Sequence, residues 1–572
     1  MTRSNILIAM VLGLLTVAAL VASAPQIGLT WDEPAYIAAS ESYVAWLDRL
    51  WHAPGYALSP RGVRAYWDIN HEHPPLDKLW SGLVWSLARH AFDDLTAHRL
   101  GNILLVGGLV ALLYLTVAAS FGQRAGLAAA AALVTLPRFF FHAHLAALDV
   151  PAAVAVFGVT ALFWHTRGRP GLGWDLLLGA AWGAALALKI NAVFVLPTLL
   201  LWLLLFDRRP RLVGRLLVAG LVGPPLFVAL WPWLYHETAA RLVAYVRFIT
   251  VDHWEIGQYY LGEWHMPPPW HFPFVMLVAV TPTALLVLAA LGVVRAANER
   301  RTTDDQSAER AAGLKRARQT GVAEAFVVGR SSLVFLWALS AAVPLLALAI
   351  GQTKVYDNER LFMPVFPFLA ALAGVGLDWA IGGVARTAHG RRLRFALPAL
   401  LFAPHLLVSA ALYPHLLSYY AEGVGGLPGA RRLGLETTYW CEVYAEALPY
   451  INANAPPGAV VWVEDWSHDV LHYYQLQGRL RKDLRIAWAE GAGSVLAGKG
   501  AEGQRADIDE ADVAIVAYRE TGLAIHPEIL RWTAGRRPVL RVERLGVPLV
   551  EVYRRDAEMS AATHASAPER ER

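Results

Sequence analysis

Long apolar stretches recur along most of the chain, and they constrain its fold more than any other feature. Hydrophobic residues make up 56% of the 572 residues and charged residues only 17%, whereas a soluble chain carries about a quarter charged residues. Each stretch has about 20 residues, the length that crosses about 30 Å of hydrocarbon as a helix, and the stretches do not alternate as the strands of a membrane barrel do. The sequence therefore predicts a polytopic α-helical membrane protein.

The apolar stretches predict about eleven transmembrane helices. They lie near residues 5–24, 100–119, 124–140, 150–166, 174–190, 192–206, 212–233, 272–294, 331–351, 361–380 and 395–412. The first is expected to remain as a span, because Pro25 directly follows the small residues that would otherwise form a cleavage site. Basic residues gather in alternate loops, which predicts a multi-pass protein of the inner (plasma) membrane with a cytoplasmic amino terminus.

The sequence is expected to divide into a transmembrane domain (residues 1–412), a small extracytoplasmic α/β domain (413–555) and a disordered tail (556–572). The apolar runs stop after residue 412, and a composition typical of globular proteins follows. The tail is rich in Ala, Ser, Glu and Arg, a composition that cannot bury a core.

Shorter elements are also predicted in the outer parts of the chain. In the first outer loop, residues 34–51 and 76–91 carry apolar side chains at helical spacing, which predicts interfacial helices. Short strands are predicted in the α/β domain at 460–463, 514–517, 539–542 and 549–553.

The charge and cysteine content exclude several classes of function. The formal net charge is +4 at pH 7, but basic residues in short loops report membrane orientation, so no nucleic-acid partner is expected. The single cysteine, Cys441, excludes an intramolecular disulfide and a cysteine-based metal centre, and we expect it to be a small buried hydrophobe.

Two carboxylates follow the first predicted span, in the motif Thr30-Trp31-Asp32-Glu33-Pro34. One interpretation is a helix start, at which a capping aspartate and a first-turn proline are common. However, a carboxylate beside apolar spans is costly unless it lines a polar cavity, where it can take a proton from an attacking hydroxyl. We therefore select Asp32 as the candidate general base.

A second polar motif, His73-Pro74-Pro75-Leu76-Asp77-Lys78, lies in the same loop. The residue before a proline is disfavoured in helical geometry, so the prolines fix His73 in an extended turn. An ordinary loop that enters a helix would look the same. A positioned His73 or Lys78 would equally hold a phosphate group at the membrane surface.

Charged and histidine residues also mark the outer ends of later spans. Asp149 either caps a helix or lines a cavity. Lys354 and Arg360 either reach to water or clamp a phosphate, which the planar guanidinium suits. His142 and His144 are candidate substrate-binding residues; no matching ligand spacing accompanies them, so no metal is expected.

Aromatic residues gather in the outer loop between residues 254 and 271, among them Tyr259, Tyr260 and Trp264. Aromatic side chains at this depth usually form the interfacial belt of a membrane protein. Their faces would also cover a sugar ring or the first isoprene units of a lipid, which makes these three residues candidate substrate contacts.

Taken together, these motifs resemble the GT-C class of membrane glycosyltransferases, in the bacterial branch related to protein O-mannosyltransferases and to the lipid A aminoarabinose transferase. The resemblance covers the predicted transmembrane domain. It rests on Trp31-Asp32-Glu33, on the motif from His73 to Lys78, on the run from Pro137 to His144 that leads into Asp149-Val150-Pro151, and on Glu359-Arg360-Leu361-Phe362-Met363-Pro364.

The resemblance implies an inverting glycosyltransferase that moves a sugar from a polyprenyl-phosphate donor to an acceptor hydroxyl on the extracytoplasmic face. By position, it makes Asp32 the base, with Glu33 in support. It makes Asp149 an acid that shapes the cavity for donor and acceptor.

The resemblance also implies which cations meet the lipid phosphate. The phosphate-binding role falls to His73 or Lys78 and to Arg360, and Lys189 or Lys354 would help to balance the charge. Phosphate with its charge balanced is a good leaving group, so a base and a cationic clamp suffice.

The expected partners are the polyprenyl-phosphate sugar, membrane lipids and an acceptor that is a protein, a lipid or a glycan. No cofactor is expected, since the lipid-linked sugar is a co-substrate, and a divalent metal is not expected either. The alternative function is a transporter or flippase for a lipid-linked sugar, which would also place charges in a membrane cavity. That alternative predicts internal repeats and broken helices near the midplane, and the sequence indicates neither.

Overall fold

The computed structural model describes residues 2–252, 257–314, 329–350, 355–385, 390–464, 467–489, 494–496, 499 and 503–556. The chain forms two compact units. The helical unit comprises Met1–Ile27, Ala35–Gln258 and His265–Gly426, and the sheet unit comprises Gly28–Pro34, Tyr259–Trp264 and Leu427–Arg572. Two short segments from within the amino-terminal half thus belong to the sheet unit.

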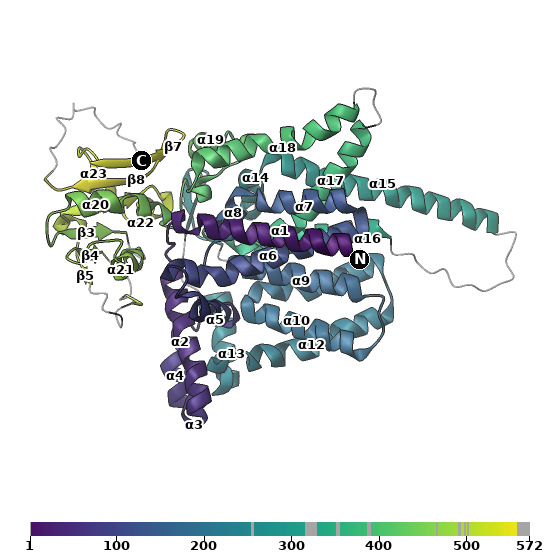
Figure 1. Ribbon diagram of the computed structural model, residues 1–572, viewed down its shortest axis with the longest axis horizontal. Helices are drawn as coiled ribbons and strands as arrows, with labels where there is room; N and C mark the ends of the chain where they lie inside the picture. Colours follow the sequence, from purple (N-terminus) through teal and green to yellow (C-terminus); the bar gives the residue numbers. More distant parts are fainter. Residues whose placement is uncertain are drawn as a thin grey trace, which may run out of the picture. The chain divides into compact units, whose positions relative to one another are not determined.

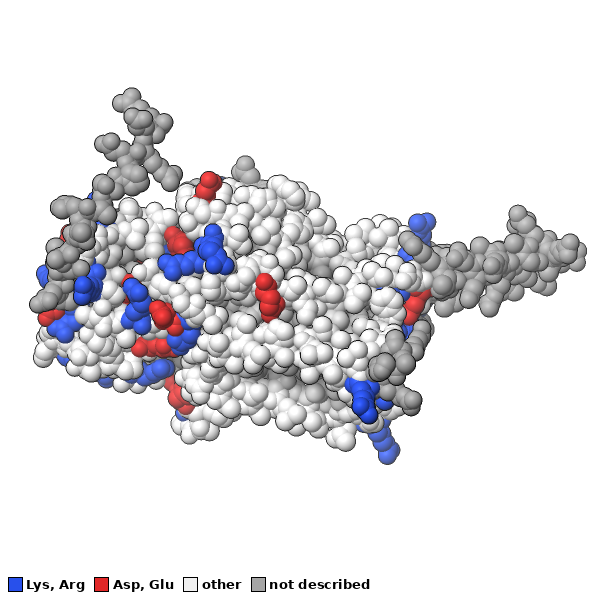
Figure 2. Space-filling view, turned by 90° about the horizontal axis from the view of Figure 1, so that it is seen from above, with Lys and Arg blue, Asp and Glu red and all other residues white. Residues whose placement is uncertain are grey.

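Long helices make up most of the helical unit, and they run side by side (Figure 1). They are α1 (Arg3–Ser23), α6 (Asp94–Phe121), α7 (Gln123–Val134), α9 (Asp149–Thr166), α10 (Leu172–Leu188), α11 (Val195–Phe206), α12 (Pro210–Ala229), α14 (Phe272–Val280), α15 (Thr283–Leu314), α16 (Arg330–Ala349), α17 (Val365–Val384) and α18 (Gly390–Leu412). Over these helices the surface seen in Figure 2 carries few charged side chains, as a lipid-facing surface requires.

The other helices of this unit connect or cross those named above. They are α2 (Glu33–His52), α3 (Pro54–Ala57), α4 (Pro60–Trp67), α5 (Leu76–Ala88), α8 (Pro137–His142) and α13 (Thr238–Arg247). In Figure 1, α2 and α4 run across the direction of the long helices. The two helices predicted in the first outer loop are thereby confirmed as α2 and α5.

Seven helices among the described residues are long and apolar enough to cross a membrane, or eight if one bent pair forms a single span. Two further apolar helices, Leu172–Leu188 and Ile190–Phe206, are shorter. Every predicted span contains a helix, but the predicted number of eleven is not confirmed. The predicted span at residues 124–140 is one reason for the lower number. It is divided into α7, which has only 12 residues, and α8, which begins at Pro137 after a turn.

One predicted span, residues 272–294, is sharply bent in the structure. Helices α14 and α15 meet at an angle of 112°. Thr281 is extended, with φ −99° and ψ 127°, and it precedes Pro282, which disfavours helical geometry at the residue before it. A second break separates α10 from the short 3₁₀ helix Ile190–Phe194, and it places Lys189 in an extended conformation.

Close backbone contact joins α15 to α17. A Cβ added at Gly376 would overlap the carbonyl oxygen of Leu288, and one added at Gly292 would overlap the carbonyl oxygen of Leu372. Small residues at a helix interface allow backbones to approach in this way where apolar lipid gives no hydrophobic driving force.

The sheet unit contains a six-stranded sheet in the order β5-β4-β3-β6-β8-β7. Its strands are β3 (Val460–Val463), β4 (Arg485–Trp488), β5 (Gly503–Arg505), β6 (Val513–Ala517), β7 (Leu540–Arg544) and β8 (Val547–Arg554). The first four in spatial order are parallel, and β8 and β7 continue the sheet antiparallel. The strand order reverses between β3 and β6, which is the topological position at which α/β sheets commonly bind ligands.

Helices and a small hairpin complete the sheet unit. They are α19 (Gly426–Arg432), α20 (Leu448–Asn454), α21 (His468–Leu476), α22 (Glu520–Ile525), α23 (Pro527–Thr533) and the strands β1 (Gln258–Tyr260) and β2 (Glu263–His265). Trp462, Ile529 and Trp532 are buried in its core. The four predicted strands are confirmed, whereas β4 and β5 were not predicted. Residues 557–572 of the predicted tail lie outside the described residues, and its disorder stays a prediction.

The contact of α15 with α17 predicts that alanine substitutions at two glycines of α17 differ sharply in their effect on stability. Gly376→Ala should lower the apparent unfolding temperature. Overpacking typically lowers the free energy of unfolding by about 1–3 kcal/mol, and we expect a loss at or above the upper end of that range because the new Cβ meets backbone atoms. A Cβ at Gly382 meets nothing within 4 Å, so Gly382→Ala should be neutral or stabilise by up to about 1 kcal/mol. Thermal unfolding in detergent measures both variants, and equal behaviour would contradict the close packing.

Candidate functional site

Four charged side chains form a group in the helical unit, which we name the Asp149 cluster: Asp149, Asp357 and Arg360 are buried, and Lys189 is partly buried. Lys189 Nζ lies 2.5 Å from Asp149 Oδ1, and Arg360 Nε lies 3.3 Å from Asp149 Oδ2. The other side of Arg360 donates from Nη1 to Asp357 Oδ2 at 2.6 Å. Two carboxylates thus face two cations, which compensates the cost of burying each charge.

Breaks in regular structure place these side chains. Asp149 begins α9, and Lys189 ends α10 where the chain leaves helical geometry with φ −158° and ψ 137°. Arg360 begins a short 3₁₀ helix, Arg360–Phe362, just before α17. Each of these charges therefore stands where a helix starts or stops, and the structure brings Asp149, Lys189 and Arg360 together.

Glu359, the residue before Arg360, belongs to a separate group of the helical unit. Its Oε2 lies 2.6 Å from Arg138 Nη1, and its Oε1 lies 3.6 Å from His142 Nε2. Arg138 is fixed further by the carbonyl of Tyr419 at 2.9 Å and by the ring of Tyr420 at 4.5 Å. Burial opposes ionisation of Glu359, but the positive charge of Arg138 outweighs it and holds the pKa of Glu359 below its usual range.

The two candidate histidines do not share a site. His144 lies 2.7 Å through Nε2 from Ser23 Oγ and 2.8 Å through Nδ1 from the carbonyl of Phe140, so both of its ring nitrogens meet protein atoms. His142 faces Glu359 instead. The ion pair of Arg138 with Glu359 was not predicted from the sequence. A charge inside a predicted apolar span is nevertheless a signal of a polar partner.

Lys78 organises the turn that carries His73. Its ammonium donates to the carbonyl of Asn70 at 2.7 Å, to Asn70 Oδ1 at 2.8 Å and to the carbonyl of His73 at 3.0 Å, which matches its three N–H donors. Burial lowers the pKa of Lys78 to about 7 and raises that of its neighbour Asp77 to about 7. His73 is half-buried and meets the ring of Tyr36 edge-on at 5.8 Å. Lys78 therefore holds this turn in place, and only His73 is placed to meet a ligand.

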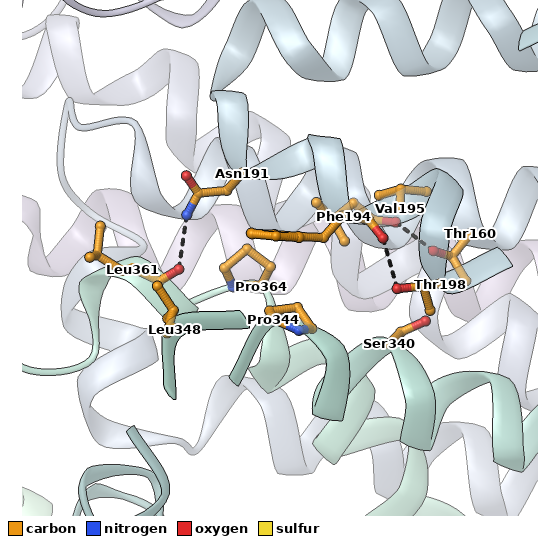
Figure 3. A pocket seen from close by; sticks show the side chains of 11 residues that line it. Thr160, Asn191, Phe194, Val195, Thr198, Ser340, Pro344, Leu348, Leu361 and Pro364 are labelled. Carbon is orange, nitrogen blue, oxygen red and sulfur yellow. Dashed lines mark hydrogen bonds between the residues drawn. The ribbon is translucent and has the colours of Figure 1, made fainter. Parts of the chain in front are cut away.

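A groove runs between α9, α11, α16 and the start of α17 (Figure 3). Its lining residues are Val156, Thr160, Asn191, Phe194, Val195, Thr198, Ser340, Pro344, Leu348, Leu361 and Pro364. The hydroxyls of Thr160 and Thr198 donate to carbonyls of their own helices, which leaves a largely apolar wall. Two lining residues, Asn191 and Leu361, lie one or two positions from Lys189 and Arg360 and are joined by a 2.9 Å hydrogen bond. The groove therefore begins beside the Asp149 cluster.

Asp32 and Glu33 lie in the sheet unit, just where α2 begins. Glu33 is fully buried, and its Oε2 accepts from the amide of Thr30 at 3.0 Å and from Thr30 Oγ1 at 3.2 Å. Glu33 thus fixes the turn that carries Asp32, which is half-buried. Trp31 lies under the guanidinium of Arg519 at 4.1 Å, which anchors the same segment.

Further acids of the sheet unit gather around Arg519, which the sequence did not single out. Arg519 Nε lies 3.7 Å from Glu436 Oε1, and Glu520 Oε2 accepts from the amide of Thr437 at 3.1 Å. Burial and the neighbouring Glu436 raise the pKa of Glu520 to about 8.

The candidate aromatic residues lie in the small hairpin of the sheet unit. Tyr260 is buried, and Trp264 is 41% exposed. Tyr259 is half-buried, and its amide donates a hydrogen bond to Thr521 Oγ1 at 2.8 Å. Of the three, Trp264 is the one placed to contact a ligand. Lys354 lies outside the described residues, so its predicted role stays a prediction.

Comparisons with known proteins agree with the resemblance predicted from the motifs. Residues 72–236 match the family model of dolichyl-phosphate-mannose-protein mannosyltransferases. No curated protein matches the chain.

Solved structures give weaker likenesses. One is ArnT from Cupriavidus metallidurans bound to undecaprenyl phosphate, at 17% identity and a TM-score of 0.47, over 97% of this chain and 99% of that chain. Another is an oligosaccharyltransferase from Archaeoglobus fulgidus tethered with an acceptor peptide, at 11% identity and a TM-score of 0.42, over 92% of this chain and 71% of that chain.

The family match confirms the predicted relation to GT-C membrane glycosyltransferases and, with it, the predicted enzyme class. It includes Asp149 and Lys189 but neither Asp32 nor Arg360. The roles of the individual residues therefore rest on the geometry and the motifs.

Glu520 predicts a pH dependence of stability. Its pKa in the folded protein is about 8, above the usual 4.5, so the folded protein keeps a proton that the unfolded chain releases. The resulting stabilisation is fully present below about pH 4.5 and is lost as the pH rises through about 8. Glu520→Gln should therefore show a smaller fall in apparent unfolding temperature between pH 5.5 and 8.5 than the parent, as measured in detergent. Glu510→Gln, at an exposed glutamate of the same unit, should follow the parent, and parallel profiles for all three proteins would refute the assignment.

Proposed function

We propose that this relative of the GT-C glycosyltransferases transfers a sugar, with inversion, from a polyprenyl-phosphate donor to an acceptor hydroxyl on the extracytoplasmic face of the inner membrane. The observation that carries the proposal is the buried pairing of Lys189 and Arg360 around Asp149 at the end of an apolar groove. A lipid phosphate needs both parts, cations for its head and an apolar channel for its tail.

Lys189 and Arg360 are the groups we assign to the donor phosphate. Arginine offers a planar fork of donors that suits two phosphate oxygens, and lysine adds a point charge. Without donor, Asp149 and Asp357 hold both cations in place, so little side-chain entropy remains to be lost when phosphate binds. Phosphate then competes with these carboxylates for the same N–H groups, and His73 is proposed as a further contact.

The groove is the proposed channel for the polyprenyl tail. It is walled by apolar side chains and begins beside the Asp149 cluster, so a lipid whose phosphate meets Arg360 can enter it with its first isoprene units. Burial of each CH₂ group contributes about 0.8 kcal/mol, so a few buried groups give substantial affinity. The family that residues 72–236 match is named for a donor of this kind, a sugar on a polyprenyl phosphate.

Asp32 is the proposed base. The acceptor oxygen attacks the anomeric carbon, Asp32 takes its proton, and the bond from that carbon to the phosphate oxygen breaks with the electron pair leaving on the phosphate. Lys189 and Arg360 stabilise the charge that develops on the leaving phosphate, so no protonated acid is required. Glu33 supports Asp32 by fixing the Thr30 turn. No metal takes part in these steps.

These roles predict different defects for two variants. Asp32→Asn should bind donor normally but transfer sugar about 10²- to 10⁴-fold more slowly, the usual contribution of a general base. Arg360→Lys should weaken donor binding by at least about tenfold, because one ammonium cannot replace a bidentate fork. Reconstituted protein with radiolabelled polyprenyl-phosphate sugars and a cell-envelope extract provides the assay, with Arg208→Lys, an exposed arginine, as the control. Wild-type transfer by Asp32→Asn, or wild-type donor affinity of Arg360→Lys, would remove that residue from the site.

The groove assignment predicts that a bulky side chain discriminates between donors. Thr160→Phe should raise KM for a long-chain donor about tenfold or more, because excluding two CH₂ groups costs about 1.6 kcal/mol. KM for a short-chain donor that does not reach the groove should stay unchanged. Gly158→Phe on the same helix points into open space and should affect neither donor. An equal rise of KM for both donors would place the tail elsewhere.

A further inference from the structure

Another group of charged residues lies in the helical unit, between α2 and α6, and shares no residue with the Asp149 cluster or with the group around Glu359. Glu41 on α2 and Asp94 and His98 on α6 bring one ligand atom each within 4.8 Å of one another. His98 is fully buried, whereas Glu41 and Asp94 are partly exposed, which leaves a path from solvent. The proposed transfer reaction uses none of the three.

The hydrogen bonds around His98 determine which of its nitrogens carries the proton. Ser40 Oγ donates its single hydrogen to the carbonyl of Ile37 at 2.8 Å. The same oxygen lies 3.2 Å from His98 Nδ1, and because its hydrogen is already used, it can only accept a hydrogen bond from this nitrogen. The imidazole therefore carries its proton on Nδ1. In the neutral ring, Nε2 is then a bare lone pair.

This lone pair faces the two carboxylates. His98 Nε2 is buried and has no hydrogen-bond partner among the described residues. Its distance to Glu41 Oε1 is 3.6 Å, longer than a hydrogen bond. A lone pair aimed at carboxylate oxygens is repelled by them unless a cation lies between the two groups. The distance from His98 Nε2 to Glu41 Oε1 also suits a shared ion, because two ligand atoms of a tetrahedral metal site lie roughly 3.4 Å apart when the metal–ligand bonds are about 2.1 Å long.

Trp85 supports the same geometry from α5. Its ring stacks on His98 with centroids 4.8 Å apart and planes 12° from parallel, and its Nε1 donates to Asp94 Oδ1 at 2.9 Å. Ser40 and Trp85 thus orient the imidazole and one carboxylate, as the groups around metal ligands usually do.

We propose that Glu41, Asp94 and His98 bind a divalent zinc ion, with water completing a tetrahedral site. One imidazole and two carboxylates are a ligand set suited to zinc, and the charge of the ion balances both acids. The ion joins α2 to α6 and so fixes the helix that begins directly after Asp32. Its role is structural, and it is distinct from the transfer reaction, for which no metal is expected.

The test measures metal binding directly, without a sugar donor. Full-length protein in detergent is stripped with a chelator and titrated with Zn²⁺ by calorimetry, and metal content is counted by mass spectrometry after dialysis. The parent should bind one zinc at this site, and Zn²⁺ should raise its apparent unfolding temperature. Glu41→Gln, at a partly exposed position that should tolerate the change, should bind zinc at least about tenfold more weakly and lose the thermal shift.

A matched control is Glu237→Gln, which removes an exposed carboxylate that lies near a cation instead of a histidine. It should bind zinc as the parent does. Absence of zinc binding by the parent, or unchanged binding by Glu41→Gln, would overturn the proposal and leave the cluster as an ion pair of a charged histidine. Because the readout is metal binding, a protein that binds zinc but transfers no sugar would refute only the proposed function.

Discussion

The cost of burying charge in an apolar protein is the constraint on which the helical unit depends. Removing one partner of a buried ion pair typically costs about 3–5 kcal/mol, so each buried charge requires an opposite charge close by. A regular helix cannot bring Asp149, Lys189 and Arg360 together, because they belong to three separate segments. The chain meets the constraint by ending α10 at Lys189 and by forming a short 3₁₀ helix at Arg360. The helix breaks and the charge cluster therefore have one physical cause.

The two ion-paired groups around residues 359 and 360 differ in what surrounds them. Glu359 turns to Arg138, which also meets the carbonyl of Tyr419 and the ring of Tyr420, and the side chains of Arg138 and Glu359 are only 1% and 0% exposed. Arg360 turns to Asp149 beside the groove, where Lys189 keeps 12% of its side chain exposed. A closed group stabilises the fold, whereas cations at the mouth of an apolar channel can exchange a carboxylate for a ligand. This difference in surroundings, and not the number of charges, distinguishes the pair of Glu359 and Arg138 from the Asp149 cluster.

Hydropathy predicted where the helices lie, because it reports which segments need an apolar solvent. It could not predict the number of spans, since a break at Lys189 or Thr281 changes the path of the chain with little change in composition. The strands β3, β6, β7 and β8 were predicted from their β-branched residues, whereas β5 is short and polar. For the site, Asp149 and Arg360 are 211 residues apart, so only the motif resemblance could join them. The partner of Arg138 and the proton on Glu520 depend on three-dimensional neighbours that local sequence does not contain.

In the sheet unit, the cost of burying a negative charge is avoided because Glu520 keeps its proton. Arg519 is the cation beside Glu436, and its guanidinium also covers Trp31, so Glu520 beside Glu436 is left to keep its proton at neutral pH. The arrangement holds the segment Gly28–Pro34 at several points: Trp31 under Arg519, Thr30 on Glu33, and the amide of Leu29 on Tyr474 Oη at 2.7 Å. The candidate base Asp32 lies in that segment. Its position within the sheet unit is therefore set by the contacts that hold its neighbours Trp31 and Glu33.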